Sequence, residues 1–191
     1  PAALGIDTKG GRSMNEIALL IAATLNAGTV LAIAALGLLI NERAGVVNLG
    51  AEGIMLVAAV VGYAAAVHSG SDLLAFVAGA LAGALLAAVF GALVIWLNTN
   101  QYATGLALSL FGVGFSAFIG QPYTRERLSE RAQYDVPLLS DIPFIGPALF
   151  KQHPMVWVAI ALTVGLMWWL NKSRSGLILR AVGESPESAH A

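Results

Sequence analysis

The sequence predicts an all-α membrane protein, a polytopic bundle of transmembrane helices with about five membrane segments. Composition is the first reason: 58% of the 191 residues are hydrophobic and only 11% are charged, whereas soluble domains carry about 25% charged residues. The second reason is that the apolar residues form long runs, most of them close to the roughly 20 residues that cross a bilayer as a helix. These runs are too long for the strands of a membrane β-barrel and lack their alternation.

The rest of the composition argues against several other classes of protein. The net charge is −1, which gives no indication of nucleic-acid binding. The chain contains no cysteine, so disulfides and thiolate metal ligands are excluded. His68, His153 and His190 fall at different ends of the predicted membrane segments, so we expect no metal site. No catalytic or cofactor-binding arrangement stands out, and a membrane enzyme is therefore disfavoured.

The first membrane segment covers residues 16–40 and contains a few polar side chains. The polar, glycine-rich stretch before it, residues 1–13, lacks the basic-then-apolar order of a signal peptide. We expect this stretch to be either non-native sequence or a flexible terminus. The membrane domain then covers residues 14–171.

Capping residues mark the start of another segment, residues 73–97. Ser71 and Asp72 precede this run and are well suited to cap a helix. Within it, Gly79 and Gly83 have the GxxxG spacing that favours close helix packing. We therefore expect a spanning helix with a neighbour close to these glycines.

The later segments cover residues 101–119 and 154–170. The last one begins with proline, which is favoured at the first helical position. The polar residues around position 100 cap the helix or face a wet cavity, and capping is the better interpretation for Asn98. Asn100 and Thr104 are four residues apart and so share one helical face.

A charged, glycine-rich stretch, ERAGVVNLGAEG at residues 42–53, precedes the remaining segment. The apolar run after it, residues 54–67, is too short to span unless residues 45–53 also lie in the membrane. Asn48 and Glu52 would then lie at membrane depth, where an unpaired carboxylate is costly. We interpret the stretch as a glycine-broken helix that lines a transport path; the alternative is a short loop followed by a re-entrant half-helix. The candidate path or break residues are Asn48, Gly50, Glu52, Gly53, Asn100 and Thr104.

Outside the membrane segments, basic residues indicate the orientation. Lys172, Arg174 and Arg180 cluster after the last segment, which predicts that residues 172–191 are cytoplasmic. Ser185 is followed by proline, a combination that predicts the start of a short helix. This orientation makes the other long polar stretch an external loop.

That external loop covers about residues 121–152 and has prolines and nearly balanced charges. Loops of this length without secondary structure are commonly functional or disordered. This loop is either a docking surface for a soluble partner or a merely solvated cap. Residues 124–132 form a candidate short surface helix within it.

Several stretches in one order carry a resemblance to a known family: ERAGVVNLGAEG, NQYATGLALSLFGVGFSAFIG, DIPFIGPALF and SRSGLILRAVGESPESA. Together they resemble the permease subunits of bacterial ABC importers of the ribose, branched-chain amino acid and nucleoside type. The similarity runs from about Met14 to Ala191 and is closest to the nucleoside branch.

The resemblance implies a passive import path and not an enzyme. Such permeases pair, as identical or different subunits, in the bacterial plasma (inner) membrane. Separate cytoplasmic ATP-binding cassette subunits hydrolyse ATP, and an external lipoprotein delivers substrate. Nucleosides or purine-like compounds are the implied substrates, with ribose or another simple sugar as the alternative. The residues implied to form the ATPase-coupling loop are Arg174, Gly176, Arg180, Gly183, Glu184, Ser185 and Pro186.

Family members continue with further membrane helices after this loop. The resemblance therefore implies a C-terminally truncated chain whose coupling loop, residues 172–191, is incomplete. An alternative of another class is an ion-coupled secondary transporter that uses Glu52. That alternative predicts uptake without any ATPase subunit.

Overall fold

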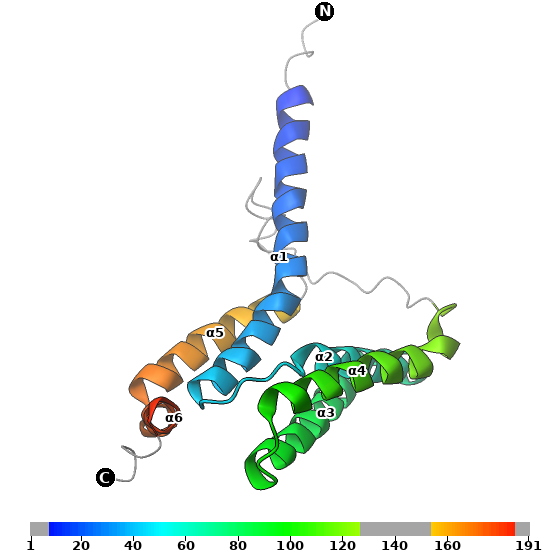
Figure 1. The fold of residues 1–191 in the computed structure, drawn as a ribbon. Helices are drawn as coiled ribbons and strands as arrows, with labels where there is room; N and C mark the ends of the chain where they lie inside the picture. The colour runs from blue at the N-terminus through cyan, green and yellow to red at the C-terminus, as the bar shows by residue number, and fades with distance from the viewer. Residues whose placement is uncertain (1–7, 127–153, 186–191) are drawn as a thin grey trace, which may run out of the picture. The chain divides into compact units, whose positions relative to one another are not determined.

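The computed structural model describes residues 8–126 and 154–185, and their regular secondary structure is entirely helical (Figure 1). The elements are α1 (Thr8–Arg43), α2 (Ala51–Ser69), α3 (Asp72–Gly91), the π-helical turn η1 (Ala92–Trp96), α4 (Gln101–Gly120), the 3-10 turn η2 (Gln121–Tyr123), α5 (Pro154–Lys172) and α6 (Arg174–Glu184). The prediction of an all-α protein is confirmed.

Within the described residues, 5 helical spans are long and apolar enough to cross a membrane. They are Leu19–Arg43, Ala51–Ser69, Asp72–Trp96, Gln101–Tyr123 and Pro154–Lys172. Each of these has at least 19 residues, close to the number that a bilayer requires. The predicted number of membrane segments is therefore confirmed, and the chain is a multi-pass membrane protein.

The chain divides into two compact units. One unit contains α5 and the part of α1 that ends at Leu36. The other contains the end of α1 from Gly37, together with α2, α3, η1, α4, η2 and α6. Each unit is described by itself below.

In the first unit, α5 begins at Pro154 as the sequence predicts. Its buried positions are Val156, Ala159 and Leu170. On α1 the buried polar residue is Thr29, whose hydroxyl donates to the carbonyl of Leu25 at 2.7 Å. This bond within its own helix satisfies the hydroxyl without a partner from another element.

In the second unit, α2 packs between α3 and α4 (Figure 1). Glycines allow α2 and α3 to approach closely: a Cβ atom at Gly79 would lie 2.9 Å from the carbonyl oxygen of Ala58 and 3.5 Å from the Cα of Gly62. Gly83 of α3 faces Ala58 and Ile54 of α2. The prediction of close packing at the GxxxG spacing is thus confirmed.

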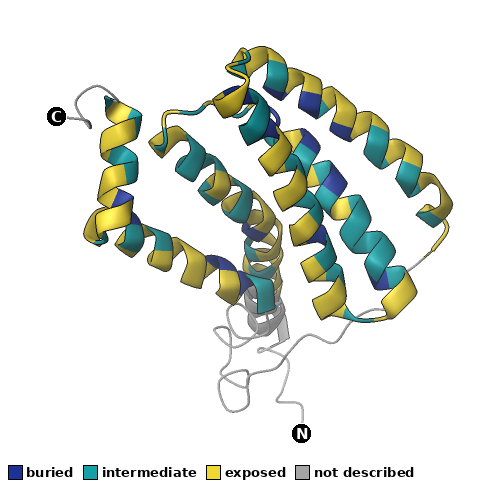
Figure 2. Cartoon of the chain, turned by 90° about the horizontal axis from the view of Figure 1, so that it is seen from below, coloured by how far each residue is buried: buried dark blue, intermediate teal, exposed yellow. Residues whose placement is uncertain are grey.

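The apolar core of this unit is small. Phe90, Val94 and Leu108 are buried together. Many other apolar side chains are exposed, and Figure 2 shows exposed positions along every helix. Leu81 is 66% exposed and Leu110 is 67% exposed. Apolar surface of this extent is expected where lipid or further membrane helices surround the bundle.

The start of α3 matches the prediction, because the Ser71 hydroxyl accepts from the backbone N–H of Leu74. The start of α4 corrects the prediction that Asn98 is the capping residue. Asn100 caps this helix, with its side-chain oxygen accepting from the N–H groups of Tyr102 and Ala103 at 3.0 and 3.1 Å. Asn98 instead has a φ of 51°, since it occupies the turn between η1 and α4. A short amide side chain tolerates this left-handed conformation, which explains asparagine there.

Further predictions concern the ends of helices. Helix α1 begins at Thr8, so part of the stretch expected to be flexible or non-native is helical. A helix that is already nucleated gains a hydrogen bond for each residue added, which explains the extension. The candidate surface helix at residues 124–132 lies outside the described residues from residue 127 onward, and residues 124–126 are not helical. The helix expected to begin at Ser185 lies outside them from residue 186 onward.

Candidate functional site

The stretch that joins α1 to α2, residues 44–50, is called the linker below. Its beginning stops α1 with a glycine in the left-handed region, Gly45 at φ 77°. The N–H of Gly45 donates to the carbonyl of Glu42 at 3.0 Å, and the N–H of Val46 donates to that of Asn41 at 2.9 Å. This bond pattern is the Schellman motif that commonly ends helices at glycine. The positive φ of this turn therefore requires glycine at position 45.

The end of the linker is held by Asn48, whose side-chain oxygen accepts from the N–H of Gly50 at 2.9 Å. Helix α2 then begins at Ala51, so the exposed Glu52 lies in its first turn. A carboxylate at a helix N-terminus is favourable because it faces the positive end of the helix dipole. Both polar side chains of the stretch thus have a local structural role.

This geometry corrects the interpretation that the membrane helix needs residues 45–53 in order to span. Helix α2 starts three residues before Ile54 and is 19 residues long, which suffices by itself. The break is the linker, which lies between α1 and α2, and Gly53 is helical. The apolar run gave the wrong start because Ala51, Glu52 and Gly53 continue the helix with little apolar character.

The linker lies against the N-terminal half of α4. The N–H of Val47 donates to the side-chain oxygen of Gln101 at 2.8 Å. Farther along, the hydroxyl of Ser109 donates to the carbonyl of Leu49 at 2.8 Å. Between these bonds, a Cβ atom at Gly105 would lie 2.9 Å from the N of Leu49. The linker is therefore fixed to α4 at several points along its length.

Helices α2 and α4 cross at glycines. A methyl group at Gly112 would overlap the backbone of Gly53, and one at Gly53 would overlap that of Leu108 and Ser109. Gly53 and Gly112 are both buried. Small residues at a crossing allow two helices to approach this closely.

The remaining path candidates, Asn100 and Thr104, are near the start of α4. Asn100 is the cap described above, and its carbonyl accepts from the N–H of Thr104 at 2.9 Å. The hydroxyl of Thr104 bonds to that of Thr99 at 2.9 Å. These polar groups have local partners, so their role in a path stays a prediction.

Helix α6 covers most of the predicted coupling residues. Arg174, Gly176, Arg180, Gly183 and Glu184 lie on it. Ser185 follows the helix directly, its N–H donating to the carbonyl of Ala181 at 3.1 Å, and Pro186 lies outside the described residues.

The faces of α6 separate the coupling residues. Gly176 is buried, and Arg180 and Gly183 are half-buried on the same side. Arg174 and Glu184 are exposed. The exposed side also presents apolar residues, Leu177, Ile178 and Val182.

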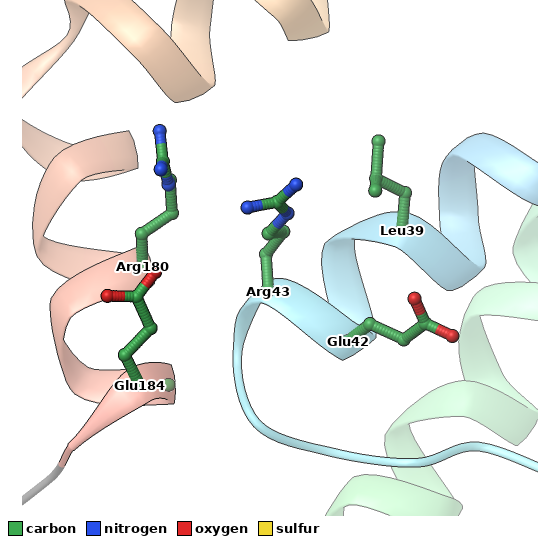
Figure 3. Close-up of a pocket in the computed structure, with 6 residues that line it drawn as sticks. Leu39, Glu42, Arg43, Arg180 and Glu184 are labelled. Carbon is green, nitrogen blue, oxygen red and sulfur yellow. The ribbon is translucent and has the colours of Figure 1, made fainter.

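A cavity of about 310 Å³ separates α6 from the end of α1. Its lining consists of Leu39, Glu42, Arg43, Arg180, Gly183 and Glu184. In Figure 3 the side chains of Arg180 and Arg43 extend in the same direction from the two helices, whereas Glu42 points away from α6. Both helices end at this cavity, and Arg43 lies in the last turn of α1, where a cation favourably faces the negative end of the helix dipole.

Beside this cavity the two chain segments touch through their backbones. A methyl group at Gly183 would overlap the carbonyl oxygen of Arg43 and lie 2.9 Å from the N of Gly45. A Cβ atom at Gly45 would lie 3.1 Å from the carbonyl oxygen of Gly183. Only a glycine at position 183 permits this approach without displacement.

A model of one protein family, described as the branched-chain amino acid transport system permease component, matches residues 20–191. The chain belongs to this permease family. No solved structure matched the chain.

Among the similar proteins is one named a putative glucose ABC transporter permease, from Haloferax volcanii, 40% identical over 181 residues. A nucleoside ABC transporter permease of Lactococcus lactis is 33% identical over 188 residues. A guanosine ABC transporter permease of Bacillus subtilis is 31% identical over 185 residues. The matches cover 92%, 92% and 91% of this chain and 55%, 59% and 58% of the relatives, so the chain spans less than two thirds of their length.

For this permease-family chain, sequence analysis missed two groups of residues. Gln101 and Ser109 were not singled out, because a single polar residue in or beside an apolar run does not reveal its distant partner. The exposed apolar residues of α6 were also missed. Their signal was present: Ile178 and Val182 are four residues apart, with Leu177 beside Ile178, in a segment that also carries Arg174, Arg180 and Glu184, which predicts an amphipathic helix.

Proposed function

We propose that the chain is part of the membrane-spanning permease subunit of an ATP-driven, binding-protein-dependent importer. Family membership and the 5 membrane-capable spans support this proposal. The subunit would lie in the bacterial plasma (inner) membrane, in contact with lipid, and pair with a second permease subunit. An external substrate-binding lipoprotein would deliver substrate, and ATP would be hydrolysed on separate cytoplasmic ATP-binding cassette subunits.

The observation that carries the coupling role is the amphipathic character of α6. Its outer side exposes Leu177, Ile178 and Val182, by 49%, 62% and 43%. The basic residues around Lys172 favour a cytoplasmic position for this helix. An exposed apolar helix face suits insertion into a groove of a soluble partner. We assign the ATPase subunits as that partner, with exposed Arg174 and Glu184 at the edge of the contact.

Nucleosides are the proposed substrate class. Relatives named for nucleoside and guanosine transport, at 33% and 31% identity, support this class. A simple sugar is the second candidate, because the relative named a putative glucose permease is 40% identical. For the path itself we propose the α2–α4 pair, with the exposed polar groups of Glu52 and Asn100 at its edge.

The substrate is tested by uptake in proteoliposomes. These would contain the full-length permease that includes this chain, with its ATPase subunits and lipoprotein. We expect ATP-dependent uptake of labelled guanosine that excess unlabelled nucleosides suppress and excess glucose does not. ATP-dependent uptake of labelled glucose, without uptake of labelled guanosine, would instead support the sugar candidate. Uptake that persists without the ATPase subunits would contradict the importer proposal itself.

A further inference from the structure

We propose that the linker carries movements of α6 to the α2–α4 pair, with Gly183 and Gln101 as positioning residues at its two ends. This inference rests on the proposed docking of ATPase subunits on α6. It adds a defined route from that helix to the membrane helices. The route consists of three contacts, each between segments distant in sequence and all within one compact unit.

The first contact joins α6 to the start of the linker. The backbone of Gly183 lies against the carbonyl of Arg43 and the N–H of Gly45. No side chain separates the two backbones, so a displacement of α6 toward the linker cannot be absorbed by a change of rotamer. Close-packed protein interiors transmit strain for this reason.

The second contact joins the linker to α4. The bond from Val47 to Gln101 is 2.8 Å long, and that from Ser109 to Leu49 is also 2.8 Å long. Val46 packs against the buried cluster that contains Leu108 of α4. Polar and apolar contacts therefore hold the linker to α4.

The third contact joins α4 to α2. Gly112 and Gly53 touch through their backbones, and Gly50 is packed between the side chains of Leu108 and Asn48. A displacement of the linker along α4 must therefore also move the start of α2. The two helices that we propose as the path would shift together.

Hydrogen bonds hold both ends of the linker, so the linker would transmit a movement of α6 and would not deform. Its first turn is fixed by the Schellman bonds at Gly45 and its last turn by the Asn48 side chain. In addition, α6 belongs to the same compact unit as the linker, α2 and α4, whereas the helix before it, α5, belongs to the other. The contacts of α6 thus group it with the proposed route.

The experiment uses the full-length permease with its partners in proteoliposomes and measures both ATP hydrolysis and substrate uptake. Gln101→Ala removes the acceptor for Val47, whereas Gln101→Glu keeps an oxygen at that place. We expect Gln101→Ala to lower the ratio of uptake to hydrolysis about three- to tenfold, the factor that corresponds to one hydrogen bond, and Gln101→Glu to retain most of it. Gln121→Ala, an exposed glutamine at the opposite end of α4, is the matched control.

A second variant tests the other end of the route. Gly183→Ala should lower the same ratio, while Gly114→Ala, a helical glycine with open space around it, should not. A ratio equal to that of the wild type in both Gln101→Ala and Gly183→Ala would overturn the inference, whether the two rates persist or fall together. Failure of the underlying function is distinct, because the wild-type assembly would then show no ATP-dependent uptake.

Discussion

The carbonyl group of Arg43 and the Cα of Gly183 are packed so closely that a methyl group on the glycine would overlap the carbonyl oxygen. These residues are far apart in the sequence and belong to motifs that were recognised separately, ERAG and RAVGE. Their contact explains why glycine is needed in both, since Gly45 ends α1 and Gly183 admits that end. It also connects the helix proposed to bind ATPase subunits with the linker.

Gly112→Ala should destabilise the crossing of α2 and α4. The added methyl group has no space beside Gly53, and overpacking of this kind costs about 1–3 kcal/mol. Thermal unfolding of the purified protein in detergent would measure the loss as a lower midpoint. Gly114→Ala is the control, because nothing lies within 4 Å of that position. Equal midpoints for both variants would contradict the proposed crossing.

Asn100→Ala should weaken the start of α4 by about 0.5–2 kcal/mol, the usual cost of losing an N-cap. The side chain accepts from two backbone N–H groups, at 3.0 and 3.1 Å. Asn98→Gly should be tolerated, because its φ of 51° suits glycine. Unfolding midpoints of the two variants compare the roles. If Asn98→Gly were as destabilising as Asn100→Ala, the assignment of the cap would be wrong.

Ile178→Asp should weaken binding of the ATPase subunits. The side chain is 62% exposed, and burying a side chain of this size in a partner contributes about 1.5–3 kcal/mol, which corresponds to at least about a tenfold loss of affinity. Co-purification of the ATPase with membranes that contain the full-length permease would measure it. Ile178→Leu keeps the apolar contact and should bind normally. Normal binding of the Asp variant would rule out this face as the docking surface.

A cysteine at Ser185 should react with a membrane-impermeant maleimide in inside-out vesicles and remain unlabelled in intact cells. The reason is the cytoplasmic position predicted from the basic residues near Lys172. The chain contains no cysteine, so the introduced thiol is the only one within these residues that the reagent can label. Labelling in intact cells would show that every helix crosses the membrane in the direction opposite to the predicted one.

The sequence by itself determined that this is a helical membrane protein and where most of its helices lie. The length of an apolar run decides whether a helix can span a bilayer, and this length can be read without any tertiary contact. Local signals were equally sufficient at Ser71 and Pro154, because a capping hydroxyl or a proline acts on its own turn.

Tertiary structure decided the packing role of the glycine-rich stretch. Gly53 looks like a helix breaker in the sequence, yet it lies inside α2, and glycine is needed there because the backbone of α4 at Leu108 and Ser109 occupies the space that a side chain would need. Gln101 shows the same limit, since its partner Val47 is 54 residues away. A sequence pattern reports periodicity and local hydrogen bonding, whereas contacts between distant backbones arise only when the helices pack.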